Sequence, residues 1–198
     1  MNESLFRILA AAIFLTGITI SLYFRRKADV ESGERVSSKD EGAPMFIALR
    51  LGGLIIWLGA IAWLVNPAWF AWSKIGLPVW ARWLGVGTGI LSDLMIYWLF
   101  SSIGNSISPT VGTRTHHRLV RTGPYRFIRH PLYTVATGFF LSYALMTDNW
   151  LFAALVISAF ILLALRVPNE EAHLIERFGD EYREYMQTTG AFLPRLKT

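Results

Sequence analysis

The sequence predicts an all-α integral membrane protein with about five transmembrane helices, the last two forming a helical hairpin, followed by a C-terminal amphipathic cytoplasmic helix. Of the 198 residues, 53% are hydrophobic and 17% are charged, and the mean hydropathy is +0.39. An ordinary soluble domain carries about 25% charged residues, and so small a globule cannot bury this apolar surplus. Apolar runs of bilayer length also alternate with polar segments. We therefore expect one membrane domain over residues 1–198.

The first membrane helix is predicted over Leu5–Phe24, which is an apolar run of bilayer length. The basic residues Arg25, Arg26 and Lys27 follow it. A secretory signal peptide would carry its basic residues before the apolar run. We therefore expect an uncleaved helix with its N terminus outside the cell. The polar residues 28–44 are expected to form a cytoplasmic connector.

Two further membrane helices are predicted over Met45–Val65 and Trp83–Ile103, which completes a three-helix half over residues 1–103. The connection between them is expected at the outer interface, where tryptophans are enriched; it contains Trp69, Trp72 and Trp80. Asp93 falls near the middle of the third helix. A carboxyl group there is costly, so it is a candidate functional group, or else a structural group bonded to a neighbouring helix or protonated.

The second half, residues 104–198, is expected to hold the functional region. Leu132–Met146 and Trp150–Leu165 are apolar and are joined by a short turn, which predicts an antiparallel hairpin. Asn169–Met186 has apolar residues at helical spacing, so an amphipathic helix is expected there.

Charge distribution predicts which end faces the cytoplasm. Residues 104–129 contain five arginines and no acid, whereas the outer connection has only two cations, Lys74 and Arg82. Basic loops mark the cytoplasmic side, so the C terminus and the candidate site are expected there, most simply in a prokaryotic inner membrane. The arginines lie in loops held at the bilayer, which argues against nucleic acid as a partner and makes membrane lipids the expected surroundings.

Two polar segments stand out at this predicted cytoplasmic end: Leu119–Tyr133 (LVRTGPYRFIRHPLY) and Arg166–Glu171 (RVPNEE). The first combines cations and aromatic rings, and the second ends in paired acids. A small zwitterionic ligand with an aromatic ring would use all three features. Two alternatives stay open. The arginines could serve topology and headgroup contact, and the acids could favour a helix start after Pro168.

Metal and nucleotide sites are not favoured. The chain has no cysteine, lacks a His-x-x-x-His spacing, and shows one Glu-x-x-His pair where a di-metal bundle uses two, so no metal is expected. No glycine-rich strand–turn–helix pattern is present, which argues against a Rossmann module.

The order and spacing of these motifs resemble the isoprenylcysteine carboxyl methyltransferase family and its prokaryotic relatives, within a superfamily that includes phospholipid methyltransferases. The similar segments span residues 99–196: HRLVRTGPY (117–125), RHPLY (129–133), RVPNEE (166–171) and FGDEY (178–182). The N-terminal half shows no family motif.

The resemblance implies an S-adenosyl-L-methionine-dependent methyltransferase whose lipophilic substrate enters from the bilayer. By position, the cofactor would contact His117, Leu119, Val120, Gly123, Tyr125, His130, Tyr133 and Glu171. Arg166 and Glu170 would be the catalytic residues, where cofactor and acceptor meet. The prenylated-cysteine α-carboxylate is the expected acceptor.

Other acceptors and functions stay open at this stage. A small thiol, a phospholipid amine or another lipid acid could accept the methyl group. An NADPH-dependent sterol-type reductase and a non-catalytic membrane scaffold are the alternatives from other classes. The oligomeric state is not predicted.

Overall fold

The computed structural model describes residues 3–32, 43–103 and 119–195. In chain order its elements are α1 (Glu3–Ser32), α2 (Ala43–Val65), the 3₁₀ helix η1 (Pro67–Ser73), α3 (Val79–Ile103), the 3₁₀ helix η3 (Gly123–Arg126), α4 (Pro131–Thr147), α5 (Trp150–Phe178) and α6 (Asp180–Thr188). The predicted all-α class is confirmed.

Four helices are long and apolar enough to cross a membrane: α1 over Glu3–Ala28, α2 over Ile47–Val65, and α3 and α5 over their full lengths. Large apolar side chains on their outer faces, among them Ile8, Leu94 and Leu165, are more than half exposed. Apolar surfaces on helices of this length are typical of contact with lipid. The chain is therefore an integral membrane protein. Helix α4 is shorter, with 17 residues, and completes the predicted group of five helices.

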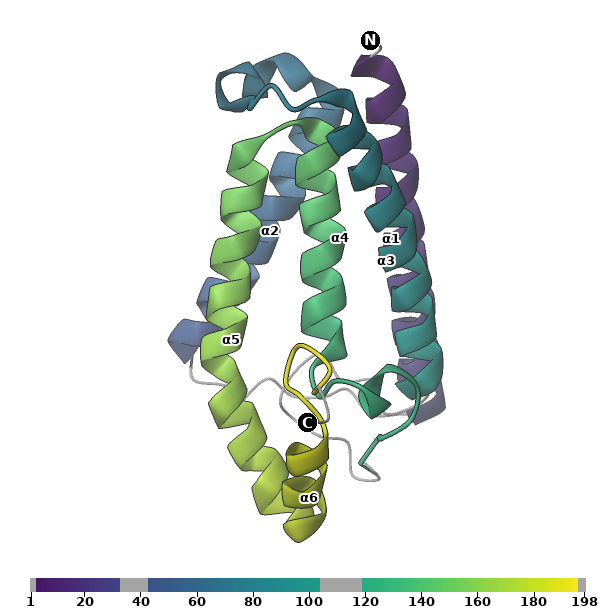
Figure 1. Cartoon of the computed structure of the whole chain (residues 1–198), viewed down its shortest axis with the longest axis vertical. Helices are drawn as coiled ribbons and strands as arrows, with labels where there is room; N and C mark the ends of the chain where they lie inside the picture. Colours follow the sequence, from purple (N-terminus) through teal and green to yellow (C-terminus); the bar gives the residue numbers. More distant parts are fainter. Residues whose placement is uncertain (1–2, 33–42, 104–118, 196–198) are drawn as a thin grey trace.

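Helix α4 lies at the centre of the bundle and packs against α1, α3 and α5, while α2 packs against α5 (Figure 1). Tyr143 of α4 shows this central position. Its ring lies 5.6 Å from Phe14 of α1, 5.9 Å from Trp63 of α2 and 5.3 Å from Phe152 of α5. Its hydroxyl donates a hydrogen bond of 2.8 Å to the carbonyl of Ala60. The aromatic core thus joins four helices through one side chain.

At the end of the bundle that holds the N terminus, the buried Arg82 links three helices. Its Nε and Nη2 donate to the carbonyl of Met146, at the end of α4, at 2.9 and 2.7 Å. Nη2 also lies 3.3 Å from the Glu3 carboxylate, and the guanidinium stands 4.0 Å from the centre of the Phe6 ring. A cation is favourable at a helix C terminus. Arg82 therefore fixes α1, α3 and α4 relative to one another.

The C-terminal helices differ from the sequence-based expectation. The helix expected over Trp150–Leu165 does not end at Leu165, and no new helix begins at Asn169, because α5 continues through Pro168 to Phe178. Proline removes one backbone donor, but Pro168 is exposed and good helix formers follow it. The break falls instead at Gly179, whose φ of 56° and ψ of −129° end α5 before α6 begins.

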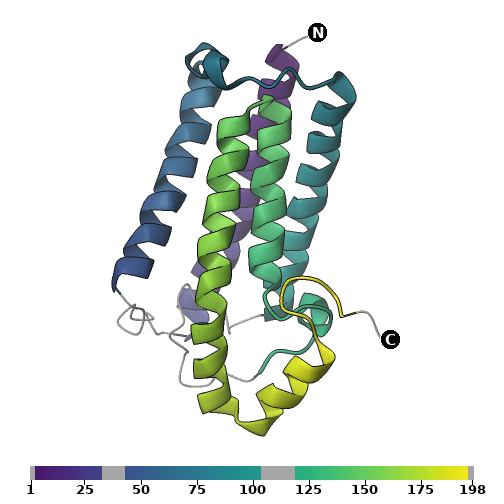
Figure 2. The ribbon, with the colours of Figure 1, turned by 60° about the vertical axis from the view of Figure 1, so that its left-hand side comes forward.

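Helix α5 extends beyond the other helices, and α6 turns back from its end toward the start of α4 (Figure 2). The expected amphipathic segment is therefore divided: Leu174, Ile175 and Phe178 belong to α5, and Tyr182 and Tyr185 belong to α6. This turn brings the C-terminal residues against the two polar segments noted in the sequence.

Candidate functional site

Residues 119–130 lead into the start of α4 and form η3 on the way. Gly123 begins η3 with a φ of +59°, in the left-handed region that favours glycine. It packs closely against α3, since a Cβ at this position would lie 2.1 Å from the Ser102 hydroxyl. Tyr125 is half-buried, and its backbone carbonyl accepts a hydrogen bond from the Tyr185 hydroxyl of α6. This segment is thus held between α3 and α6.

The paired acids of α5 meet the first residues of α4. Tyr133 donates a hydrogen bond of 2.7 Å from its hydroxyl to Oε2 of Glu170. Glu171 is buried, and its Oε1 accepts from Arg129 Nε at 2.8 Å and from His130 Nε2 at 3.1 Å. The two acids therefore have different partners. Glu170 bonds a neutral phenol, while Glu171 forms an ion pair within a largely desolvated cluster.

His130 lies between the two acids. Its Nδ1 stands 4.0 Å from Glu170 Oε2, on the side opposite the Nε2 contact with Glu171. An ionised carboxylate only accepts hydrogen bonds, so Nε2 carries the proton in the Glu171 contact. The ring stacks on Tyr133, with centroids 5.5 Å apart and planes at 11°. One imidazole is thus oriented by a carboxylate and an aromatic ring.

The residues after α6 cover this cluster. We define Thr189–Phe192 as the C-terminal strap. The backbone N–H groups of Arg129 and His130 donate to the carbonyls of Gly190 and Ala191, at 2.8 and 2.9 Å. Thr134 adds a side-chain hydrogen bond of 2.9 Å to the Phe192 carbonyl. The strap is therefore paired with the segment that supplies His130.

The phenols of α6 stay neutral beside this cluster. Burial raises the pKa of Tyr185 to about 12, although Arg129 and Arg121 act in the opposite direction. Burial likewise raises the pKa of Tyr182, and the Glu171 carboxylate adds to the effect. Both phenols therefore keep their protons across the physiological range.

The structure brings together four of the site residues predicted from the sequence: His130, Tyr133, Glu170 and Glu171. Arg166 precedes Glu170 by one helical turn on the same face of α5, and its side chain is half-buried.

Four of the remaining predicted residues lie in the segment that precedes α4. Leu119 and Val120 are half-buried at the start of the described segment, and Gly123 and Tyr125 form part of η3. His117 lies outside the described residues. The functional roles assigned to all these residues remain predictions.

Arg129 was expected only as one of the cations of the first polar segment, with no contact assigned to it, and the strap was not expected at the site. Arg129 was one of many arginines in its segment, and its contacts with Met186 and Thr189 are nearly 60 positions away in the chain. No local periodicity signals such a contact. Gly190 offered a weak signal: a Cβ there would lie 2.0 Å from the Leu193 carbonyl oxygen, so the turn requires glycine.

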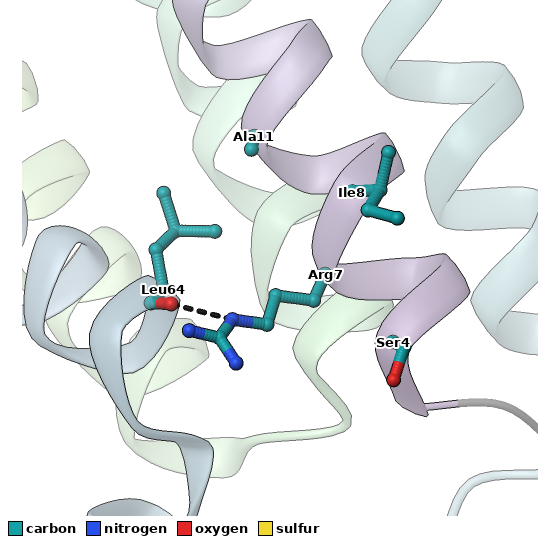
Figure 3. Close-up of a pocket in the computed structure, with 5 residues that line it drawn as sticks. All are labelled: Ser4, Arg7, Ile8, Ala11 and Leu64. Atoms are coloured by element: carbon teal, nitrogen blue, oxygen red, sulfur yellow. Dashed lines mark hydrogen bonds between the residues drawn. The ribbon is translucent and has the colours of Figure 1, made fainter.

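A cavity of about 360 Å³ lies at the other end of the bundle, between the start of α1 and the end of α2 (Figure 3). Its lining includes Ser4, Ile8 and Ala11. Arg7 reaches across it and donates from Nη2 to the carbonyl of Val65 at 2.7 Å and from Nε to that of Leu64. The cation thus satisfies the carbonyl end of α2. This cavity is separate from the acid cluster.

The fold is a bundle of apolar helices with a polar cluster at one end. Among solved structures, the chain is similar to the eukaryotic intramembrane Ras methyltransferase ICMT (isoprenylcysteine carboxyl methyltransferase). The TM-score is 0.58 with 19% sequence identity, over 94% of this chain and 67% of that one. A likeness at this identity shows the fold.

The chain belongs to the phospholipid methyltransferase family, whose model matches residues 80–181, just over half of its length. The resemblance inferred from the motifs is confirmed at the level of this superfamily. The matched region contains all but the first residue of α3, then η3, α4 and α5, and the first two residues of α6. It therefore includes His130, Tyr133 and both acids.

Curated relatives carry several different descriptions. The nickel-cobalt-cadmium resistance protein NccN of Alcaligenes xylosoxydans xylosoxydans is 37% identical over 43% of this chain and 40% of its own length. Methanethiol S-methyltransferase 1 of Bradyrhizobium diazoefficiens is 37% identical over 35% of this chain and 24% of its own. The protein-S-isoprenylcysteine O-methyltransferase of Schizosaccharomyces pombe is 34% identical over 47% and 41%. The chain thus matches less than half the length of each.

Proposed function

We propose that the protein is an S-adenosyl-L-methionine-dependent methyltransferase that acts on a lipophilic acceptor, foremost the α-carboxylate of a prenylated cysteine or a similar lipid-like acid. The observation that carries the proposal is the acid pair of α5. Glu170 is held by Tyr133, and Glu171 by Arg129 and His130, at one end of an apolar bundle. A lipid-borne group and a charged cofactor could meet at such a place.

The donor set fits this cofactor. Its amino-acid moiety has an ammonium, which matches the Glu170 and Glu171 carboxylates, and a carboxylate, which matches nearby arginine and histidine N–H groups. The adenine ring would pack among the half-buried residues Leu119, Val120 and Tyr125, with His117 and Gly123 on the same segment. When bound, the cofactor supplies a methyl group made electrophilic by a sulfonium.

The chain's own residues would mainly align the reactants and keep water away. Methyl transfer is an in-line displacement, so its rate depends strongly on the separation and alignment of donor and acceptor. A carboxylate acceptor is already ionised at neutral pH and needs no base. We assign Arg166 to orient that carboxylate. We assign Glu170 to hold the cofactor's ammonium, with its own orientation fixed by Tyr133.

A small thiol is the second candidate acceptor, because relatives described as methanethiol S-methyltransferases are similar to this chain. A thiol must lose its proton as the new sulfur–carbon bond forms. We assign Glu170 to accept that proton. A phospholipid amine, suggested by the family description, would also have to lose a proton to a base.

For the orientation, we propose that the acid cluster faces the cytoplasm and the N terminus faces outward. The basic residues 25–27, near the end of α1, and the basic segment that follows α3 in the chain support this arrangement. A prokaryotic inner membrane is the proposed location. The acceptor would then approach from the bilayer and the cofactor from the cytosol.

The test is methyl transfer from radiolabelled S-adenosylmethionine by detergent-purified protein, offered S-farnesylcysteine, methanethiol or phosphatidylethanolamine. The proposal expects label on the S-farnesylcysteine carboxylate, and its loss in Glu170→Gln and Arg166→Ala. Label on methanethiol alone would select the thiol reaction. Full activity in both variants would refute the assignment of Arg166 and Glu170.

A further inference from the structure

Arg129 makes two kinds of contact with one guanidinium. Its Nε donates to Glu171 Oε1 at 2.8 Å, and its Nη1 donates to the carbonyls of Met186, at 3.3 Å, and Thr189. The Arg129 and Glu171 side chains are 11% and 10% exposed. The guanidinium therefore connects an acid of α5 to the end of α6 in a site largely shielded from water.

This position suits arginine more than any other cation. The carbonyls at the end of α6 carry partial negative charge and lack partners within the helix, so they attract a cation. The planar guanidinium can bond them through one nitrogen and the Glu171 carboxylate through another. A lysine offers a single nitrogen at the end of a shorter reach.

The backbone of the same residue binds the strap. Arg129 N–H bonds the Gly190 carbonyl, and the next N–H, of His130, bonds that of Ala191. Phe192 at the end of the strap lies 6.0 Å from the His130 ring and 5.1 Å from the Phe160 ring of α5. The strap thus contacts the residue between the two acids as well as the residue that orients Glu171.

We propose that Arg129 is a positioning residue that holds the Glu171 carboxylate in the cofactor site by anchoring it to the end of α6, and that the strap is a working part of that site. This inference rests on the proposed function for the identity of the ligand. It adds that the residues after α6 control cofactor affinity through Arg129.

The first test needs no ligand. Hydrogen–deuterium exchange of the His130 amide, in the full chain in detergent, reports whether the strap stays paired. Arg129→Gln is expected to speed this exchange about tenfold or more, the size of one lost charge-assisted hydrogen bond. Arg129→Lys should show a smaller effect. Arg183→Gln is the matched control, because Arg183 is an exposed arginine of α6 that pairs with Asp180. Unchanged exchange in Arg129→Gln would overturn the proposal.

The second test measures S-adenosylhomocysteine binding by calorimetry. Arg129→Gln and Glu171→Gln are each expected to weaken binding about tenfold or more, and the double variant should be no weaker than the weaker-binding single variant. A loss caused by general destabilisation would instead add to that of Glu171→Gln. Additive losses would therefore overturn the positioning role.

The two proposals fail in different ways. If the wild-type protein does not bind S-adenosylhomocysteine, the proposed function is contradicted, and the cofactor role of Arg129 falls with it. If the wild type binds and Arg129→Gln binds equally well, only the positioning role is overturned.

Discussion

The hydroxyl of Tyr133 donates a 2.7 Å hydrogen bond to Oε2 of Glu170, which joins the first turn of α4 to α5. The Tyr133 ring also stacks on His130, whose Nε2 bonds Glu171. A single tyrosine therefore contacts one acid directly and the other through the histidine. Helix α5 places the two acids next to each other, and Tyr133 helps to orient their carboxylates.

Tyr133→Phe is expected to lower methyl-transfer kcat/KM about two- to tenfold while the fold is kept. The ring and its stacking remain, while the hydrogen bond to Glu170 is lost. Tyr97→Phe is the control, because Tyr97 lies on the exposed face of α3 beside Phe24. Equal activity in Tyr133→Phe and the wild type would show that this hydrogen bond does not orient Glu170.

Gly123→Ala is expected to destabilise the protein by more than about 2 kcal/mol. The substitution adds the cost of a left-handed conformation, about 1–2 kcal/mol, to a clash with Ser102. Gly76→Ala shares the positive φ but has no heavy atom within 4 Å of the added Cβ, so it should cost only the first part. Thermal unfolding in detergent measures both, and Ser102→Gly should restore part of the loss in Gly123→Ala. Equal losses at the two glycines would refute the packing explanation.

Arg82→Ala is expected to lower stability by about 2–4 kcal/mol without changing S-adenosylhomocysteine affinity. It removes a buried cation and both of its hydrogen bonds to Met146, at the end of the bundle opposite the acids. Lys74→Ala removes only a partly exposed pair with Glu3 and should cost about 0.5 kcal/mol or less. Thermal unfolding and calorimetry separate the two effects. A weakened affinity in a folded Arg82→Ala protein would contradict this separation.

Asp93→Asn is expected to leave stability equal to or above that of the wild type, with activity retained. The Asp93 side chain is buried between α1 and α4, and its Oδ1 has no hydrogen-bond partner within the described residues. Removing a potential charge from such a place relieves a cost. Unfolding temperature and methyl transfer are the two readouts. Loss of activity in a folded variant would instead establish Asp93 as a functional group.

The membrane helices could be predicted because long apolar runs have one stable form in a bilayer. The residues at which these helices end were harder to predict. Helix α1 continues past the basic residues 25–27 to Ser32, since arginine and lysine are good helix formers. A helix boundary was expected near Pro168, because proline usually marks the start or end of a helix. The helix instead ends at Gly179.

Within the candidate site, local sequence features could be predicted, and contacts between distant parts of the chain could not. The proximity of His130 and Tyr133 to Glu170 and Glu171 could be predicted, because each residue lies in a short segment dense in polar groups. The part played by Arg129 could not, because it depends on a turn at Gly179 and on carbonyl groups, which every residue possesses. The sequence alone therefore does not show which backbone carbonyl accepts a hydrogen bond.

The most direct test of the central claim is calorimetric binding of S-adenosylhomocysteine, S-adenosylmethionine and NADPH to the detergent-purified protein, with Glu170→Gln measured alongside the wild type. Both adenosyl ligands are expected to bind at about one per chain, and Glu170→Gln is expected to weaken their binding. Binding of NADPH alone would contradict methyl transfer in favour of reduction. Binding of none of the three would mean that the acid cluster holds the helices together and no such cofactor.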